Sequence, residues 1–306
     1  TTSGGYTDAQ KAERSIGTMA RALGYSEIIT YSFISPSYYD KIRLPADSPL
    51  RNSMKILNPL GEDTSIMRTT ILPSMLEILT RNYNYRNKAV RLYEIGKVYF
   101  ARPDGMADEP KLLCLGGYGG GMDFFQLKGA VERILAGLRI SDVTFEAESE
   151  NPSYHPGRCA KVYAGSKLLG VLGQIHPLAA ANYGVDAELY TAELRLDGML
   201  AARGATPVYT PLPRFPAVTR DVAIVCSADI PVAKLSACIL AAGGQYLKGC
   251  ELFDVYPGAP IPAGYKSVAF SLTLRADDQT LTDDHAEETM QSVLKALKET
   301  FNATIR

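Results

Sequence analysis

The sequence has few of the residues from which metal centres and nucleophilic sites are built. Its 306 residues include only three histidines and five cysteines. The cysteines are widely spaced and form no Cys-x-x-Cys pair, which is typical of buried thiols in a reducing compartment. His155 and His176 flank Cys159, but no fourth ligand stands at a spacing that suits zinc, and no serine or cysteine has the context of a nucleophile. We therefore expect no metal ion and no catalytic residue in this chain.

Long apolar runs and a marked net charge are also missing. No apolar stretch approaches the roughly 20 residues of a membrane span, and no basic-then-apolar leader opens the chain. The formal net charge is −1, and the residues from Pro207 onward carry 9 basic against 11 acidic side chains. We expect a cytoplasmic protein without membrane contact, whose charge creates no long-range field that attracts nucleic acid.

Proline divides the chain into two parts. Pro207, Pro211 and Pro213 fall within seven positions, where neither a helix nor a central strand can continue. A chain of this length is also long for a single hydrophobic core. We predict a first domain over residues 1–205, a linker over residues 206–213 and a second domain over residues 214–306.

The first domain combines many short strands with a few helices. An amphipathic helix begins after Thr7, a good N-cap, and ends before Gly24. Short turns between strands indicate an α+β fold on a largely antiparallel sheet. Further helices are predicted over residues 37–42, 71–83 and 123–138, and strands or extended segments over residues 27–33, 54–57, 89–100, 111–117, 143–147, 159–164, 167–175 and 188–196.

The second domain has a different order of elements. Its pattern is β-α-β-β-α-β, which is typical of ferredoxin-like folds. Thr282 caps the last helix, and two aspartates in the first turn suit the positive end of the helix dipole. The six elements are predicted over residues 218–226, 231–242, 246–256, 266–275, 283–301 and 303–306.

Five glycines lie between a predicted strand and the helix that begins at Asp123. A strand, glycines and a helix can form a phosphate cradle. However, the spacing fits neither the P-loop nor the dinucleotide-binding motif, and Lys128 lies inside the helix. A turn that packs closely on the sheet is the favoured interpretation.

The segment Arg81-Asn82-Tyr83-Asn84-Tyr85-Arg86-Asn87-Lys88 mixes cations with aromatic rings. Phosphate pairing and base stacking would make it an RNA contact. A polar helix end or a contact with another subunit is the favoured alternative.

The hairpin between the second and third strands of the second domain presents a more specific surface. With a period of two, Asp254 and Tyr256 share one face with small residues such as Ser267, while Phe253 and Val255 point to the other face. A carboxylate can accept hydrogen bonds from guanine, a ring can stack on a base, and small residues allow close approach. A solvated sheet face explains the same pattern equally well.

Four motifs of the second domain occur in a distinctive order and spacing. The motifs are Arg214-Phe215-Pro216-Ala217-Val218-Thr219-Arg220-Asp221-Val222-Ala223, Leu252-Phe253-Asp254-Val255-Tyr256, Ile261-Pro262-Ala263-Gly264-Tyr265-Lys266-Ser267 and Thr280-Leu281-Thr282-Asp283. Together they resemble the ferredoxin-like anticodon-binding domain of bacterial phenylalanyl-tRNA synthetase β subunits. Tyr265 departs from that family, which often has a lysine there.

The first domain is similar to the class II synthetase-like core of the same subunit, which is catalytically degenerate. Class II catalysis needs an Arg-x-Glu pair on one face of a strand, whereas Arg91 and Glu94 are three residues apart and point to opposite faces. The glycine-rich motif 3 with its terminal arginine is also missing. The similar motifs are Tyr31-Ser32-Phe33, Asn58-Pro59-Leu60, Met67-Arg68-Thr69-Thr70-Ile71-Leu72-Pro73, Tyr93-Glu94-Ile95-Gly96-Lys97-Val98, Asp123-Phe124-Phe125, Lys128-Gly129, His155-Pro156-Gly157-Arg158 and Gly173-Gln174-Ile175-His176-Pro177.

The resemblance implies a non-catalytic part of phenylalanine–tRNA ligase. The chain would contact a catalytic α subunit in an (αβ)2 heterotetramer, be inactive alone and bind no cofactor, while the holoenzyme uses ATP and Mg²⁺. Because β subunits of the family carry further N-terminal domains, including an editing site, we expect a fragment. The residues expected to contact the anticodon region of tRNA(Phe) are Asp254, Tyr256, Ser267, Arg214, Phe215, Arg220 and Lys266.

Two alternatives differ in class. A single-chain synthetase of organellar type would join a working class II core to the same terminal domain, but the missing motif 3 argues against it. A protein-interaction module without an RNA role is the second alternative. Since the second domain is slightly acidic, we expect weak tRNA binding by the chain alone, with selectivity from stacking and base-edge hydrogen bonds.

Overall fold

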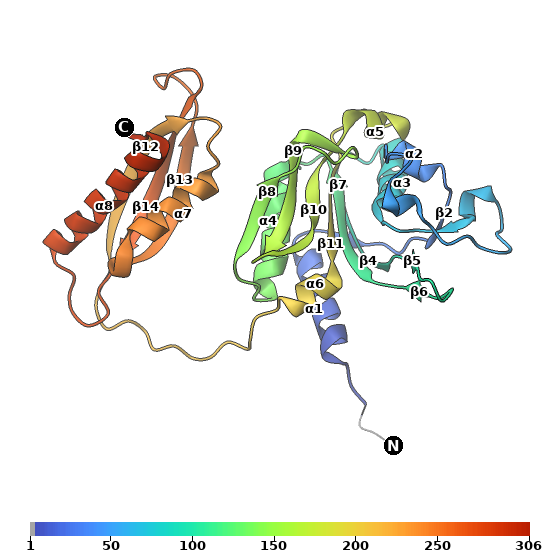
Figure 1. Cartoon of the computed structure of the whole chain (residues 1–306), viewed down its shortest axis with the longest axis horizontal. Coiled ribbons are helices and arrows are strands. Elements are labelled where there is room, and N and C mark those ends of the chain that lie inside the picture. Colours follow the sequence, from blue (N-terminus) through green and yellow to red (C-terminus); the bar gives the residue numbers. More distant parts are fainter. Residues whose placement is uncertain (1–3) are drawn as a thin grey trace. The chain divides into compact units, whose positions relative to one another are not determined.

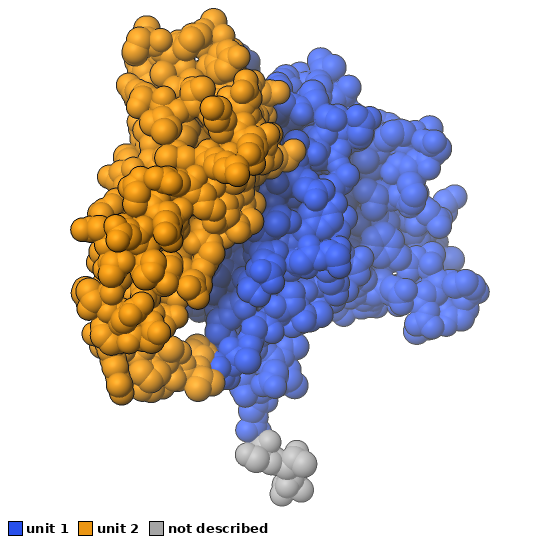
Figure 2. Space-filling model, turned by 60° about the vertical axis from the view of Figure 1, so that its left-hand side comes forward, with its two compact units in different colours: residues 1–206 blue, residues 207–306 orange. Residues whose placement is uncertain are grey.

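A computed structural model describes residues 4–306 and divides the chain into two compact units, Thr1–Thr206 and Pro207–Arg306 (Figures 1 and 2). The boundary falls within the proline-rich segment. Among residues 4–306, no helix is long and apolar enough to cross a membrane.

Unit 1 is built on a seven-stranded sheet. Its first two strands are parallel, and every other neighbouring pair is antiparallel. The mixed α+β fold on an antiparallel sheet is therefore confirmed. The strand order is β1 (Ser26–Glu27), β4 (Val90–Lys97), β7 (Lys111–Tyr118), β11 (Tyr190–Arg195), β10 (Lys167–Ile175), β9 (Tyr154–Ala164) and β8 (Val143–Ala147).

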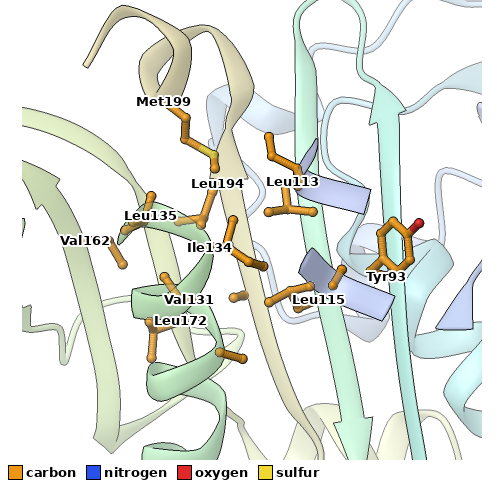
Figure 3. Close-up of a cluster of buried hydrophobic side chains, with 14 of the residues drawn as sticks. Tyr93, Leu113, Leu115, Val131, Ile134, Leu135, Val162, Leu172, Leu194 and Met199 are labelled. Carbon is orange, nitrogen blue, oxygen red and sulfur yellow. The ribbon is translucent and has the colours of Figure 1, made fainter. Parts of the chain in front are cut away.

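Helices cover both faces of this sheet (Figure 1). Successive residues of β4 alternate between two cores, because Tyr93 packs in one and Leu92 in the other. Figure 3 shows the first core, in which Ile134 lies near Leu113 and Leu115. Helices α1 (Asp8–Ala22), α4 (Phe124–Gly137) and α6 (Leu196–Ala201) contribute to the first core, and α2 (Tyr38–Lys41), α3 (Leu72–Asn84) and α5 (Pro177–Asn182) to the second.

The helix N-termini follow the capping chemistry of the sequence. Thr7 forms a capping box with Gln10 at the start of α1. Asp123 accepts a hydrogen bond of 2.7 Å from the amide of Gln126 at the start of α4. The predicted starts of both helices are confirmed.

Short extended segments differ most from the prediction. Residues 27–33 form no continuous strand, because only β1 and β2 (Phe33–Ile34) at the two ends find partners, and β2 pairs with β3 (Ile66–Met67). Residues 54–57 contribute one isolated bridge, between Lys55 and Ile66. The long strand predicted over residues 89–100 is broken into β4 and β5 (Phe100–Ala101). Elements that the sequence pattern did not indicate are α5, α6, β3, β6 (Ala107–Asp108), which pairs with β5, and the 3₁₀ turns Pro49–Arg51, Glu62–Thr64 and Gly244–Tyr246.

Unit 2 has the predicted β-α-β-β-α-β order. Its four strands lie in the order β13-β14-β12-β15, and neighbouring strands are antiparallel. Both helices contribute to a core on one face of the sheet, through residues such as Leu235 and Val293 against Phe270, and a smaller cluster includes Leu274 and Ala286. The elements are β12 (Val218–Ser227), α7 (Val232–Ala242), β13 (Leu247–Tyr256), β14 (Tyr265–Leu274), α8 (Asp283–Phe301) and β15 (Thr304–Ile305).

Candidate nucleic-acid interface

The face of the unit 2 sheet that is turned away from α7 and α8 is called the open face. Strand register places Tyr256 opposite Ser267 and Asp254 opposite Ala269. Since Val268 and Phe270 belong to the core, Asp254 and Tyr256 lie on the open face. The shared face predicted from the sequence is therefore present.

Tyr256 is exposed but held in place. Its ring is 40% exposed, and its hydroxyl donates a hydrogen bond of 2.8 Å to the carbonyl of Ala259. A side chain at Gly258 would come within 2.7 Å of that hydroxyl, so the turn after β13 closes tightly on the ring. The guanidinium carbon of Arg306 lies 5.9 Å from the ring centroid, within reach of a cation–π interaction. An aromatic ring that is fixed in advance loses little entropy when a base stacks on it.

The open face is poor in cations. On this face, Ser271 of β14 lies between Glu251 of β13 and Asp221 of β12. This row of strand partners is next to the row that contains Asp254. The described strand residues that the register places on this face include no lysine or arginine, and Arg306, which follows β15, approaches the face at Tyr256. Such a surface offers carboxylate acceptors and a ring to a nucleobase, but few partners to phosphate groups.

A β-bulge changes the orientation expected for one apolar residue. The register shifts between Leu252 and Asp254, which leaves Phe253 as the extra residue. Val255 keeps its predicted side, opposite Val268, yet neither Phe253 nor Val255 joins the core. They are 57% and 42% exposed.

Three other residues were expected to contact RNA, but none of them forms an accessible surface with Tyr256. These residues are Ser267, Arg220 and Lys266. Ser267 lies on the open face but is only 2% exposed. Arg220 pairs with Leu272 on the helix side, where its guanidinium lies 3.2 Å from Asp283.

Lys266 also lies on the helix side of the sheet, opposite Cys226. Its amine donates hydrogen bonds to the carbonyls of Ala228 and Ile230. Arg214 and Phe215 precede β12, and Arg214 is exposed. The seven predicted residues are thus spread over two faces of the sheet and the segment before it.

In unit 1, Glu94 is committed to a buried ion pair. Arg68, 1% exposed, approaches Glu94 at 2.8 Å and donates further hydrogen bonds to Thr30 and to the carbonyl of Lys97. A side chain at Gly96 would lie 2.3 Å from the guanidinium. Two motifs of the sequence, at residues 67–70 and 93–97, therefore meet at this pair.

Arg91 and Glu94 face opposite sides of β4, as the sequence predicts. Residue 91 has the same parity as Tyr93, which packs in the core of α1 and α4, while Glu94 is turned to the side of Arg68. An arginine and a carboxylate so placed cannot bind one nucleotide together.

Glu193 has a structural task that its sequence context did not reveal. Its carboxylate accepts a hydrogen bond of 2.6 Å from the amide of Ile71 and another from the hydroxyl of Thr70. It caps the N-terminus of α3 from a strand far along the chain, together with Thr70, whose hydroxyl accepts a hydrogen bond from the amide of Leu72. Burial raises the pKa of Glu193, and these hydrogen bonds oppose the rise.

The glycines before Asp123 form a tight turn against β4. Gly119 has a φ of 66°, and a side chain there would lie 2.0 Å from the carbonyl of Lys88. The favoured interpretation, a turn packed closely on the sheet, is confirmed.

The two histidines near Cys159 accept local backbone hydrogen bonds. His155 accepts from the amide of Gly157, and His176 from the amide of Leu178. Over residues 4–306, no three His, Cys, Asp or Glu side chains gather as metal ligands would.

The chain matches family models for a class of protein in which a tRNA synthetase core is joined to an anticodon-binding domain. The chain is similar to the pyrrolysyl-tRNA synthetase of Desulfitobacterium hafniense, with a TM-score of 0.53 and 17% identity over 63% of this chain and 68% of that chain. This likeness shows the fold alone. Residues 213–306 match the family described as ferredoxin-fold anticodon binding domain.

The particular family is equally clear. Residues 1–196 match the phenylalanyl tRNA synthetase beta chain CLM domain. Phenylalanine–tRNA ligase beta subunits of Clostridium acetobutylicum and Clostridium tetani are 43% and 41% identical to the chain, over 92% and 99% of its length. The chain belongs to the phenylalanine–tRNA ligase beta-subunit family. It spans only 36% and 38% of the length of these two relatives.

Proposed function

We propose that this chain is a non-catalytic segment of the β subunit of a cytoplasmic phenylalanine–tRNA ligase. Unit 2 recognises the anticodon of tRNA(Phe), and unit 1 is a scaffold for a catalytic α subunit in an (αβ)2 heterotetramer. In this proposal, residues 1–205 form the scaffold core, residues 206–213 the linker and residues 214–306 the anticodon-binding domain. The observation that carries it is the pairing of an exposed ring, Tyr256, with a carboxylate, Asp254, on a sheet face that no helix of unit 2 covers.

Base recognition is assigned to these two side chains. Tyr256 stacks on one anticodon base, and Asp254 accepts hydrogen bonds from the Watson–Crick edge of a guanine. Ser267 lies opposite Tyr256 in the next strand and is covered, so its part is to leave room for the ring. Arg220 and Lys266 face the helices, which leaves Arg214 and Phe215 for contacts with flanking nucleotides.

Aminoacylation then belongs to the α subunit, which would bind ATP and Mg²⁺. The chain contributes no catalytic group, because Glu94 is neutralised by Arg68 and Glu193 caps α3. Phenylalanine-dependent ATP–pyrophosphate exchange by the isolated chain is expected to be undetectable. Measurable exchange would instead support a single-chain synthetase.

The decisive experiment is a tRNA-binding titration of the assembled enzyme. Tyr256→Ala should weaken binding of tRNA(Phe) by about 1–3 kcal/mol, and should also weaken binding of a tRNA with a changed anticodon, because the ring can stack on any base. Asp254→Asn should weaken binding of tRNA(Phe) but leave binding of a tRNA that lacks the recognised guanine unchanged. Tyr256→Phe should retain most of the affinity because the ring remains. Ser271→Ala, on the same face, is the matched control. Unchanged discrimination between the two tRNAs in both variants would refute anticodon recognition by the open face.

A further inference from the structure

A stretch of unit 1 carries the cations that the open face lacks. Residues 78–93 contain Arg81, Arg86, Lys88 and Arg91 and no acidic residue. The first three are exposed, in the last turn of α3 and the loop that leads to β4 (Figure 1). Throughout residues 4–306, no ion pair includes any of these three. Their charges are therefore available to an external anion.

A cavity opens beside these cations. Its volume is about 530 Å³, within the range of about 300–1,000 Å³ that small-molecule pockets span. Arg86 and Lys88 line it together with Tyr83 and Tyr118, whose rings meet edge to face at 6.1 Å. A shallow site with aromatic walls and a cationic rim suits a flat, anionic ligand such as a nucleotide.

The backbone that carries the cations is fixed by several contacts. The amide side chain of Asn87 donates a hydrogen bond of 2.8 Å to Asn82, and the carbonyl of Asn87 accepts one of 2.9 Å from the hydroxyl of Tyr118. The turn at Gly119 packs against the carbonyl of Lys88. Because the loop is braced in this way, little ordering entropy is lost when it binds a ligand.

Two acidic side chains lie in or near the cavity. One of them is bound to neighbouring side chains, and the other does not line the cavity. Glu188 lines the cavity, where it approaches Arg158 at 2.9 Å and accepts a hydrogen bond from the hydroxyl of Tyr190. Asp186 is exposed two residues earlier but does not line the cavity. Of the charged residues that line the cavity, Arg86 and Lys88 are cations and Glu188 is the one carboxylate, so the lining retains a positive charge.

We propose that this surface, the α3–β4 patch of Arg81, Tyr85, Arg86 and Lys88, is a second RNA-binding site. The cations neutralise phosphate groups, and Tyr85, whose side chain is 76% exposed, stacks on an unpaired base. Phosphate contacts at this patch do not depend on the RNA sequence. They complement the open face of unit 2, which offers hydrogen-bond acceptors and an aromatic ring to bases. The inference extends the proposed function, since it assumes that tRNA is the RNA concerned.

The test compares charge variants of the whole chain in tRNA filter-binding titrations at several salt concentrations. Arg86→Gln/Lys88→Gln should lower the affinity for tRNA(Phe) and for a tRNA with a changed anticodon by the same factor. The slope of log K against log salt should become shallower by about 0.7–0.9 for each phosphate group that the variant no longer neutralises. Arg133→Gln/Arg203→Gln, which removes two exposed cations outside the patch, should change neither quantity.

Variants of Tyr85 separate stacking from charge. Tyr85→Ala should lower the affinity without changing the salt slope, and Tyr85→Phe should restore it. An unchanged salt slope in the Arg86/Lys88 variant would overturn the proposal. So would unchanged tRNA affinity together with weaker binding to the α subunit, because the patch would then be a protein contact. Asp254→Asn reports separately on anticodon discrimination, so either proposal can fail while the other stands.

Discussion

The two sheets of this protein use their faces differently. The sheet of unit 1 is packed by helices on both faces, with α1, α4 and α6 on one side and α2, α3 and α5 on the other. The sheet of unit 2 has its helices on one face. When helices cover both faces of a sheet, its buried charged side chains must pair with one another, as Arg68 and Glu94 do. A sheet that is covered once can present Asp254 and Tyr256 to a ligand, and this difference separates a scaffold from a recognition surface.

The largest effect that tests this comparison is expected at Arg68. Arg68→Met leaves Glu94 buried without its cation, and should destabilise unit 1 by about 3–5 kcal/mol. Amide hydrogen exchange resolved by segment is the measurement, because it reports each unit separately. Exchange from β12 and β14 of unit 2 should stay as in the unmodified chain.

A double variant distinguishes the missing charge partner from a general packing defect. Arg68→Met/Glu94→Gln removes both charges, so it should be more stable than Arg68→Met alone. If the double variant were the less stable of the two, the ion pair would not be what holds this region.

A smaller effect is expected at the helix caps, one in each unit. Asp123 caps α4, and Thr282 accepts a hydrogen bond from the amide of His285 at the start of α8. Replacement of either residue by alanine should cost about 0.5–2 kcal/mol, and only in its own unit. Segment-resolved hydrogen exchange would show protection reduced in α4 by Asp123→Ala and in α8 by Thr282→Ala. Reduced protection in both units would mean that the two unfold together.

The smallest effect concerns pH and is confined to unit 1. Burial, with the nearby charges of Arg43 and His155, lowers the pKa of His176, whose neutral ring caps α5 by accepting from Leu178. A folded-state pKa below the unfolded value of about 6.5 stabilises the protein above pH 6.5, and this contribution is lost as the pH falls through the folded pKa.

His176→Asn retains an N-cap acceptor but does not titrate in this range. Urea unfolding at pH 7.5 and pH 5.5 should therefore show the unmodified chain losing more stability than the variant on acidification. Equal decreases would show that His176 does not contribute to the pH dependence.

Local sequence patterns predicted the bounds of an element correctly where its structure depends on its own residues. The strands at residues 143–147 and 167–175 and the helix at residues 283–301 have the predicted bounds, because period and caps lie within the segment itself. The strand expected at residues 27–33 is mostly absent, and Ile29 and Tyr31 in it are 91% and 79% exposed. Its sequence favours an extended chain, but a strand also needs a partner edge, which only the tertiary structure supplies.

The candidate site shows the same division. The shared face of Asp254 and Tyr256 follows from a period of two that holds between them. The bulge at Phe253 does not follow from it, because an extra residue depends on how β13 meets β14. Nor could the sequence show that Ser267 is covered or that Lys266 donates to loop carbonyls on the helix side.

By itself, the sequence determined the order of elements in unit 2, the helix caps and the family resemblance. All of these depend on residues that are close together in the chain or on motifs of fixed spacing. The tertiary structure alone decided which charges are used internally and which remain available. Glu193 accepts hydrogen bonds at the N-terminus of α3, and Glu94 is paired with Arg68. Arg86 and Lys88 line a cavity, and neither forms an ion pair with any of the described residues. Pairing of charges depends on distances between segments that lie far apart in the sequence, and those distances exist only once the sheet has formed.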